Sequence, residues 1–246
     1  MSKKKTYFVS DFHLGIPNIK ESHKRERHII NWMNEIEKDA KTIYFLGDIF
    51  DFWFEYKKVV PKGFVRLLGK IASLTDNGVK IHMFVGNHDL WMNDYLEKEV
   101  GITIHHKSKV IKENNKKLFI GHGDGLGKGD YFYKLIKHMF TSKICKWIFA
   151  RLHPNLGLAI AHAWSKKSRK KNETPFISEE KEILFDYCKK QQKIMPVNYY
   201  IFGHRHIPLK LKIDENTIYI NLGDWITHNT YAVLEEGNLK LEQYKY

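Results

Sequence analysis

Side chains that can bind divalent metal ions recur in five short motifs along the chain. The motifs are Asp11-x-His13, Gly47-Asp48, Gly86-Asn87-His88-Asp89, Gly121-His122-Gly123-Asp124 and Gly203-His204-x-His206. Carboxylate, amide and imidazole ligands without a thiolate suit manganese, magnesium, iron or zinc. A Gly-Asp pair or a single histidine is usually part of an ordinary turn, so each motif alone is weak evidence. The five motifs together predict a metal site.

Each motif directly follows a short apolar run that is typical of a buried strand. The runs are Thr6–Ser10, Ile43–Leu46, Lys80–Val85, Lys117–Ile120 and Asn198–Phe202. In open α/β sheets, ligands bind beyond the carboxyl ends of the strands, so we expect these motifs to meet there. The expected metal ligands are Asp11, His13, Asp48, Asn87, His122, His204 and His206. Seven ligands predict two ions that share one bridging carboxylate.

A pair of metal ions is the equipment of a phosphoester hydrolase. Two ions about 3.5 to 4 Å apart can acidify a shared water to hydroxide and neutralise phosphate oxygens during in-line attack. We expect His88, beside Asp48 and Asn87 in the catalytic group, to act as general acid or to stabilise transition-state charge. Asp89 is expected to hold the His88 ring in its working tautomer. The histidines outside the five motifs, His162 among them, are interpreted as ordinary residues.

The elements between the motifs predict the architecture. A helix from Ser22 to about residue 39 and another near 62–76 separate the first three strands, which implies parallel pairing with right-handed crossovers. A short helix near 94, a turn at 114–115 and a helix from about 178 follow. The last part, 198–246, is expected to be a mostly antiparallel second sheet. The prediction is an α/β fold, a four-layer α/β/β/α sandwich.

Length and composition fit a single domain over residues 1–246. The chain has 246 residues, 43% of them hydrophobic, and shows no repeat or Pro/Gly/Ser-rich linker. Cys145 and Cys188 lie far apart, which argues against a disulfide framework and fits a reduced compartment. The apolar run after the basic N-terminus is too short for a signal peptide, and no stretch reaches the roughly 18 apolar residues that span a bilayer.

The positive charge is concentrated in one segment. From 131 to 172 there are ten basic residues and no acidic one, while the whole chain has a net charge of +13. Apolar residues at helical spacing, such as Ile136 and Phe140, predict a helical cap insertion at about 126–176 that is broken near Pro154. A basic face of this kind gains about 1 kcal/mol per cation at an anionic lipid surface.

Aromatic residues of the insertion have two possible roles. Phe140, Trp147, Phe149 and Trp164 suit a membrane interface or an acyl pocket, or they pack on the core of the insertion itself. In the same way, the run 52–54 (Phe-Trp-Phe) forms either a wall of the substrate site or part of the protein core.

The five motifs together resemble the signature of calcineurin-like metallophosphoesterases over residues 6 to about 225. This resemblance implies two ions, one of which would be held by Asp11, His13, Asp48 and His206. The other would be held by Asp48, Asn87, His122 and His204, with Asp48 bridging the pair. Manganese is the expected metal because the ligands are oxygens and imidazoles.

The segment Ser10–Gly15, the run Gly47–Tyr56 and the position of the insertion are similar to those of the UDP-2,3-diacylglucosamine pyrophosphatase family of lipid A biosynthesis. This closer resemblance implies hydrolysis of a lipid-linked nucleotide sugar to UMP and lipid X. It implies a cytoplasmic enzyme associated peripherally with the inner membrane, where the basic cap meets anionic lipid. It also implies substrate contacts at Asn87, His88, Asp130, Ser165, Arg169 and His204. Nucleic acid and an obligate protein partner are not expected.

His88 departs from that family, whose best-known members carry arginine at this position, whereas the wider superfamily carries histidine. A nuclease or phosphomonoesterase that uses the same metals therefore remains an alternative, and the basic segment is compatible with it. A non-catalytic scaffold is a further alternative, which predicts a missing ligand. Every expected ligand is present.

Overall fold

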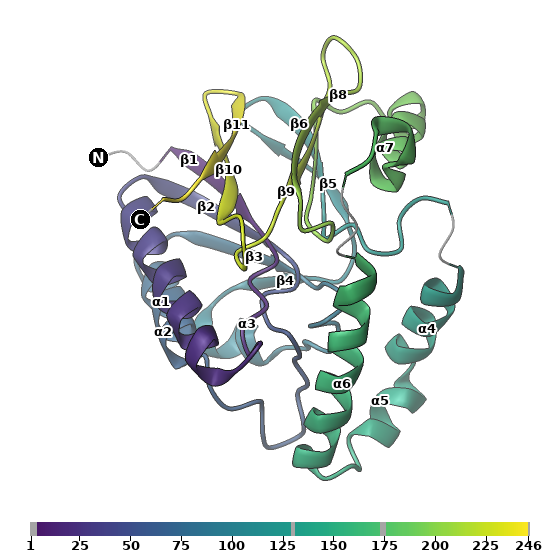
Figure 1. Ribbon diagram of the computed structural model, residues 1–246. Helices are drawn as coiled ribbons and strands as arrows, with labels where there is room; N and C mark the ends of the chain where they lie inside the picture. Colours follow the sequence, from purple (N-terminus) through teal and green to yellow (C-terminus); the bar gives the residue numbers. More distant parts are fainter. Residues whose placement is uncertain (1–3, 129–130, 173–175, 246) are drawn as a thin grey trace.

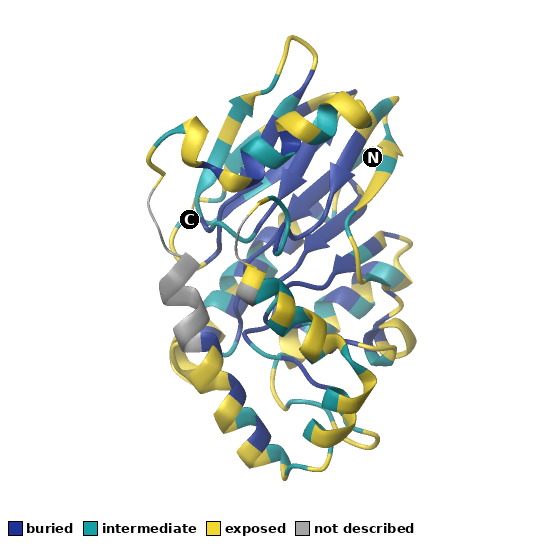
Figure 2. Ribbon diagram, turned by 90° about the vertical axis from the view of Figure 1, so that its right-hand side faces the viewer, coloured by how far each residue is buried: buried dark blue, intermediate teal, exposed yellow. Residues whose placement is uncertain are grey.

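Two β-sheets packed face to face form the centre of the computed structural model, and helices cover their outer faces (Figure 1). The structure describes residues 4–128, 131–172 and 176–245, without the side chains of 132 and 166–172. Buried residues are concentrated on the strands of both sheets, whereas exposed residues dominate the outer helices (Figure 2). The expected α/β/β/α sandwich is confirmed.

The first sheet has six strands in the order β11-β10-β1-β2-β3-β4. These are β1 (Lys5–Val9), β2 (Ala40–Leu46), β3 (Lys80–Phe84), β4 (Thr103–His105), β10 (Thr230–Glu235) and β11 (Asn238–Gln243). β1 to β4 pair in parallel, and three helices connect them: α1 (Ile19–Ile36), α2 (Val65–Asp76) and α3 (Tyr95–Val100). The predicted parallel alternation of strands and helices is therefore confirmed.

Helices α1 and α2 cover the outer face of this sheet. Asn18 caps α1 by accepting the N–H of Glu21 at 3.0 Å, and an apolar face that includes Trp32 and Met33 is buried. No side chain of α2's own N-terminus caps it. Instead the buried Glu26 of α1 accepts the N–H of Leu67 at 3.0 Å, which joins the two helices.

The second sheet has five strands in the order β5-β6-β7-β9-β8. These are β5 (Lys109–Glu113), β6 (Lys116–Ile120), β7 (Tyr199–Phe202), β8 (Pro208–Lys212) and β9 (Ile218–Leu222). A short 3-10 helix, η1 (Glu179–Lys181), precedes α7 (Ile183–Ile194). α7 packs Phe185 and Cys188 against Tyr200 and Tyr219 on the outer face. Between the sheets, residues such as Phe8, Tyr44 and Ile201 form a shared core.

The prediction for the C-terminal strands was wrong in two respects. The second sheet is mixed, because β7 pairs in parallel with both β6 and β9. In addition, β10 and β11 belong to the first sheet, where β10 lies antiparallel to β1 with Phe8 opposite Ala232. This placement covers the open edge of β1 and buries Leu234 and Leu239 between the sheets.

Three α-helices between β6 and η1 form what we call the cap: α4 (Tyr131–Thr141), α5 (Lys143–Phe149) and α6 (Pro154–Asn172). α6 starts at Pro154, which agrees with the predicted break. Ser142 caps α5 by accepting the N–H of Cys145 at 3.1 Å. Both cysteines are free.

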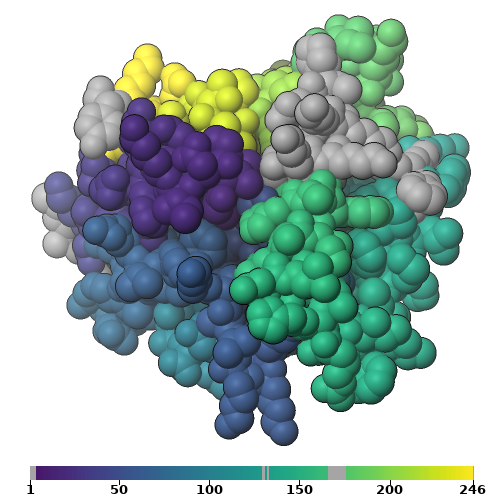
Figure 3. Space-filling view, turned by 60° about the horizontal axis from the view of Figure 1, so that its bottom comes forward, coloured from purple at the N-terminus to yellow at the C-terminus, as the bar shows by residue number. Residues whose placement is uncertain are grey.

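The cap packs on the core through aromatic residues. The Phe149 ring lies 4.7 Å from the ring of Phe54 and 4.6 Å from that of Trp91, centre to centre. The Trp91 indole N–H donates to the Phe140 carbonyl at 2.7 Å. Figure 3 shows α6, in green, beside the segment that follows β2, in blue. Among the described residues, no helix has the length and apolar character needed to cross a membrane.

Candidate active site

All seven predicted metal ligands lie just beyond the carboxyl ends of five strands. β1, β2 and β3 of the first sheet and β6 and β7 of the second deliver them, so both sheets contribute to one site. The structure brings the seven side chains together in two overlapping groups that share Asp48. The structure thus places the seven side chains side by side at one edge of the two sheets.

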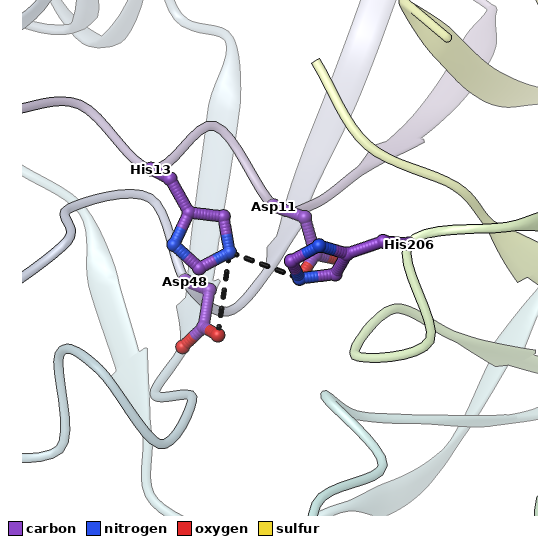
Figure 4. A group of neighbouring side chains, drawn as sticks. All are labelled: Asp11, His13, Asp48 and His206. Carbon is purple, nitrogen blue, oxygen red and sulfur yellow. Dashed lines mark hydrogen bonds and ion pairs between the residues drawn. The ribbon is translucent and has the colours of Figure 1, made fainter. Parts of the chain in front are cut away.

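The first group consists of Asp11, His13, Asp48 and His206 (Figure 4). One ligand atom from each residue lies within 4.8 Å of those of the others, and all four residues are buried. The Nε2 atoms of His13 and His206 are 3.1 Å apart. The Nε2 of His206 lies 3.2 Å from the Asp11 Oδ1, and the Nε2 of His13 lies 3.7 Å from the Asp48 Oδ2.

The second group consists of Asp48, Asn87, His122 and His204. The Nε2 of His122 lies 3.3 Å from the Asp48 Oδ2 and 3.2 Å from the Asn87 Oδ1. The Nδ1 of His204 lies 3.0 Å from the same Asn87 oxygen. The other His122 nitrogen, Nδ1, lies 2.8 Å from the Leu46 carbonyl, which directs Nε2 into the site.

The donor atoms of the first group fit a divalent cation. The Asp11 Oδ1 is buried and accepts no hydrogen bond within the described chain. The two facing imidazole nitrogens of His13 and His206 repel each other unless a proton or a cation lies close to them. Oxygens and neutral imidazoles in this arrangement are ligands for manganese, iron, zinc or magnesium.

The pKa values show that the site attracts positive charge. Burial alone would lower the pKa of His13, but its contacts with the Asp11 and Asp51 carboxylates raise the pKa to about 10. Burial also lowers the pKa of His122, but the charge of Asp48 favours its protonated form and raises the pKa to about 10. For Asp48, burial is outweighed by the charges of His122 and His88, which lower its pKa. The carboxylates therefore stay ionised and need compensating positive charge.

The backbone around the ligands is strained and needs glycine neighbours. Asp11, His13, Asp48, His204 and His206 have positive φ angles between 43° and 70°, a conformation that costs a non-glycine residue roughly 1 kcal/mol or more. At Gly86, a Cβ would lie only 2.1 Å from the Asp48 Oδ1. At Gly203, it would lie 2.3 Å from the Asp11 Oδ2. The glycines of the motifs thus let the backbone approach the ligands.

Asp51 is a site residue that sequence reasoning missed. It is fully buried, and its Oδ1 lies 3.6 Å from the His13 Nδ1 and 3.8 Å from the His88 Nδ1. Burial alone would raise its pKa, but contacts with the His13 and His162 rings lower the pKa below its ordinary value. A signal was present, because a single carboxylate inside the aromatic run 50–54 is costly to bury without partners.

The prediction for Asp89 was wrong. Its carboxylate accepts the N–H of Gly86 at 2.7 Å and the N–H of Ile49 at 2.8 Å, so it joins the loops after β2 and β3. Burial and the neighbouring charge of Asp48 raise its pKa to about 7. The His88 ring instead has its Nδ1 3.2 Å from the Asp51 carbonyl oxygen, because adjacent side chains in this loop point in different directions.

The remaining predicted contact residues are only partly described. Ser165 on α6 is 4% exposed and lies beside His88, with its Oγ 3.0 Å from the His88 Nδ1. Asn87, His88 and His204 lie at the site, as described above. Asp130 and the side chain of Arg169 lie outside the described residues.

A largely apolar cavity of about 320 Å³ lies between the cap and the core, beside the ligand groups. Asp51, Asn87 and His88 line it together with residues of the cap, including Phe140, Phe149, Ile160, Ala161 and Trp164. The half-buried Phe52 and the buried Trp53 both line the wall, whereas the buried Phe54 packs its ring against Phe149. Trp147 is 60% exposed, and the Arg151 guanidinium lies 4.8 Å from its ring centre.

Lys137 brings a positive charge to the wall of this cavity. Its Nζ lies 2.5 Å from the Asp124 Oδ2, and the Tyr133 hydroxyl donates to the same oxygen at 2.5 Å. Asp124 follows His122 in its motif, so this contact connects α4 of the cap to a loop of the ligand site.

Comparison with known proteins agrees with this geometry. Residues 4–208 match the calcineurin-like phosphoesterase family. A protein of Porphyromonas gingivalis named UDP-2,3-diacylglucosamine hydrolase is 37% identical, over 98% of this chain and 97% of its own length. Proteins of the same name from Histophilus somni and Vibrio parahaemolyticus are each 28% identical. These alignments cover 94% and 96% of this chain and 96% and 97% of the relatives.

Proposed function

Because the chain belongs to the calcineurin-like phosphoesterase family, we propose that it is the hydrolase that cleaves the pyrophosphate bond of UDP-2,3-diacylglucosamine. The products are UMP and 2,3-diacylglucosamine 1-phosphate, also called lipid X, in lipid A biosynthesis. The observation that carries this proposal is the apolar cavity whose wall includes Asn87 and His88 of the ligand site. A phosphate-cleaving centre beside an apolar cavity suits a substrate that joins a nucleotide to acyl chains.

Two divalent ions complete the site in this proposal. Asp11, His13, Asp48 and His206 would hold one ion, and Asp48, Asn87, His122 and His204 would hold the other. When bound, the ions supply the Lewis acidity that activates water and neutralises phosphate oxygens. Manganese is the proposed metal because every ligand is an oxygen or an imidazole nitrogen.

His88, with Asp48 and Asn87, forms the catalytic group. The His88 Nε2 lies 3.9 Å from the Asp48 Oδ2, and its ring centre is 4.8 Å from that of His13, so the ring borders the first ligand group. From this position it protonates the leaving oxygen or donates a hydrogen bond to the phosphate. The cavity encloses the acyl chains and keeps water away from them.

Residues 1–246 form one metallophosphoesterase domain in this proposal, with the cap insertion at about 126–176. The substrate contacts are Asn87, His88, Asp130, Ser165, Arg169 and His204. Of these, Asn87, His88 and Ser165 line the cavity, and His204 lies beside Asn87 in the ligand site.

We also propose that the enzyme binds the cytoplasmic face of the inner membrane through its cap, as a peripheral protein. Several large apolar side chains of the cap are exposed, among them Tyr131 (75%), Ile144 (73%) and Trp147 (60%). They lie in the segment of ten basic residues without an acid. Apolar insertion and attraction to anionic headgroups act together in this type of surface. We expect the protein to float with phosphatidylglycerol vesicles in a density gradient and not to float with neutral vesicles.

The reaction itself is tested by product analysis after metal removal and reloading. Chelator-treated protein is expected to be inactive, and manganese is expected to restore release of UMP and lipid X from UDP-2,3-diacylglucosamine, detected by mass spectrometry. Reactivation only by zinc would overturn the metal assignment. Hydrolysis of a generic phosphodiester without any release of UMP would place the protein in another branch of the family.

A further inference from the structure

Two polar residues of the cap reach the buried carboxylate of Asp51. The Ser165 hydroxyl donates to the Asp51 Oδ2 at 2.8 Å, and the Nδ1 of His162 lies 3.4 Å from the same oxygen. Ser165 and His162 are three residues apart on α6, so both side chains lie on the same helix face. Through this face the cap contacts a carboxylate that follows β2 of the core.

The same serine also contacts His88. The Ser165 Oγ lies 3.0 Å from the His88 Nδ1, and a hydroxyl that donates to Asp51 keeps two lone pairs to accept from an imidazole N–H. All three residues are buried, and a buried polar group that loses its partner costs more than the bond contributed. The arrangement therefore favours one orientation of the His88 ring.

Asp51 joins this contact to the ligand groups. While its Oδ2 faces the cap, its Oδ1 lies 3.6 Å from the Nδ1 of His13. The cap residues and a metal ligand thus act on the two oxygens of one carboxylate. Displacement of α6 would disturb Asp51 and His88 even if no acyl chain were present.

We propose that Ser165 and His162 are positioning residues through which docking of the cap completes the catalytic site around His88. This proposal rests on the proposed hydrolase function and adds to it. A serine that only contacted the lipid-linked substrate would affect the hydrolysis of that substrate alone. A positioning serine also affects an ester too small to occupy the apolar cavity.

The test compares bis(4-nitrophenyl) phosphate with UDP-2,3-diacylglucosamine in the metal-loaded protein. Ser165→Ala is expected to lower kcat on the small ester on the order of tenfold, with little change in KM, because a hydrogen bond to a charged group is lost. Ser165→Thr keeps the hydroxyl and is expected to recover most of the rate. His162→Ala, at a side chain that is 46% exposed, is expected to lower kcat roughly threefold.

Ser142→Ala is the matched control, because it removes a cap hydroxyl that touches neither Asp51 nor His88 and only caps α5. It is expected to hydrolyse the small ester at the wild-type rate. Full kcat of Ser165→Ala on the small ester, with a raised KM for the diacylated substrate, would show that Ser165 is a substrate contact only and would overturn the proposal.

A spectroscopic measurement separates this proposal from the hydrolase function. In ¹⁵N-histidine-labelled protein loaded with zinc, which is diamagnetic, and with His88 assigned by a His88→Gln variant, the ring nitrogen shifts of His88 are expected to change in Ser165→Ala. They are expected to stay unchanged in Ser142→Ala. An unaltered His88 spectrum in Ser165→Ala would reject the positioning role. Absence of hydrolysis of either ester by wild-type protein would reject the hydrolase function, and the spectrum would still decide the positioning role.

Discussion

Narrowing the apolar cavity should shorten the acyl chains that the enzyme prefers. Ala161 on α6 is buried and lines the cavity beside Ile160 and Trp164. Ala161→Leu adds three carbon atoms to the wall and displaces about three methylenes of substrate. At about 0.8 kcal/mol per buried methylene, this loss is about 2.4 kcal/mol, or roughly fifty-fold in kcat/KM.

The assay is kcat/KM for a series of UDP-diacylglucosamines with increasing chain length. For wild-type protein, the value should rise roughly fourfold per methylene until the cavity is filled. For Ala161→Leu, the rise should stop about three carbons earlier, and the shortest chains should react as with wild type. Ala163→Leu, at an exposed position of the same helix, is the control. Equal losses at every chain length, or no loss at any, would refute the assignment of the cavity to acyl chains.

Three further predictions follow from the contacts of the site and the core. Gly86→Ala should abolish activity and weaken manganese binding in calorimetry, since its Cβ would lie 2.1 Å from the Asp48 Oδ1; wild-type affinity would contradict this. Glu26→Ala leaves the N–H of Leu67, in the first turn of α2, without its acceptor, so urea unfolding should show a loss of about 1 to 3 kcal/mol with unchanged kcat; an unchanged unfolding free energy would argue against this contact. In the folded protein, the pKa of both His13 and His122 is about 10, which is higher than in the unfolded chain. Both imidazoles therefore keep their second proton until the pH approaches 10. Metal binding at pH 7.5 should therefore release about two protons and tighten with pH, as calorimetry in buffers of different ionisation enthalpy measures; no proton release would count against it.

Local sequence could predict those site residues that directly follow a strand. A ligand immediately after a strand has a fixed place at the sheet edge, so Asp48 and His122 were placed correctly without any knowledge of distant contacts. Sheet membership of β10 could not be predicted in this way. Its continuous apolar run, residues 231–234, fits a strand of either sheet, and the choice depends on a pairing with β1 more than 200 residues away in the chain, Phe8 with Ala232.

The residues around His88 show the same limit. Asp89 is adjacent to His88 in sequence, but its carboxylate binds backbone N–H groups of two loops. Asp51 has its role because Ser165, 114 positions later, lies on a helix that folds back over it. His162 was interpreted as ordinary because nothing in the residues next to it reports this contact. Side-chain orientation in a loop depends on the tertiary packing, which local patterns do not contain.

The role of the apolar cavity in substrate recognition is tested by the ratio of kcat/KM for UDP-2,3-diacylglucosamine to that for UDP-N-acetylglucosamine, measured with manganese. Both substrates carry the same pyrophosphate and nucleotide, so the ratio isolates the contribution of the acyl chains. We expect a ratio of at least 10³, because three or more buried methylenes per chain contribute about 0.8 kcal/mol each. A ratio near one would contradict this expectation, because the apolar cavity would then have no part in substrate recognition.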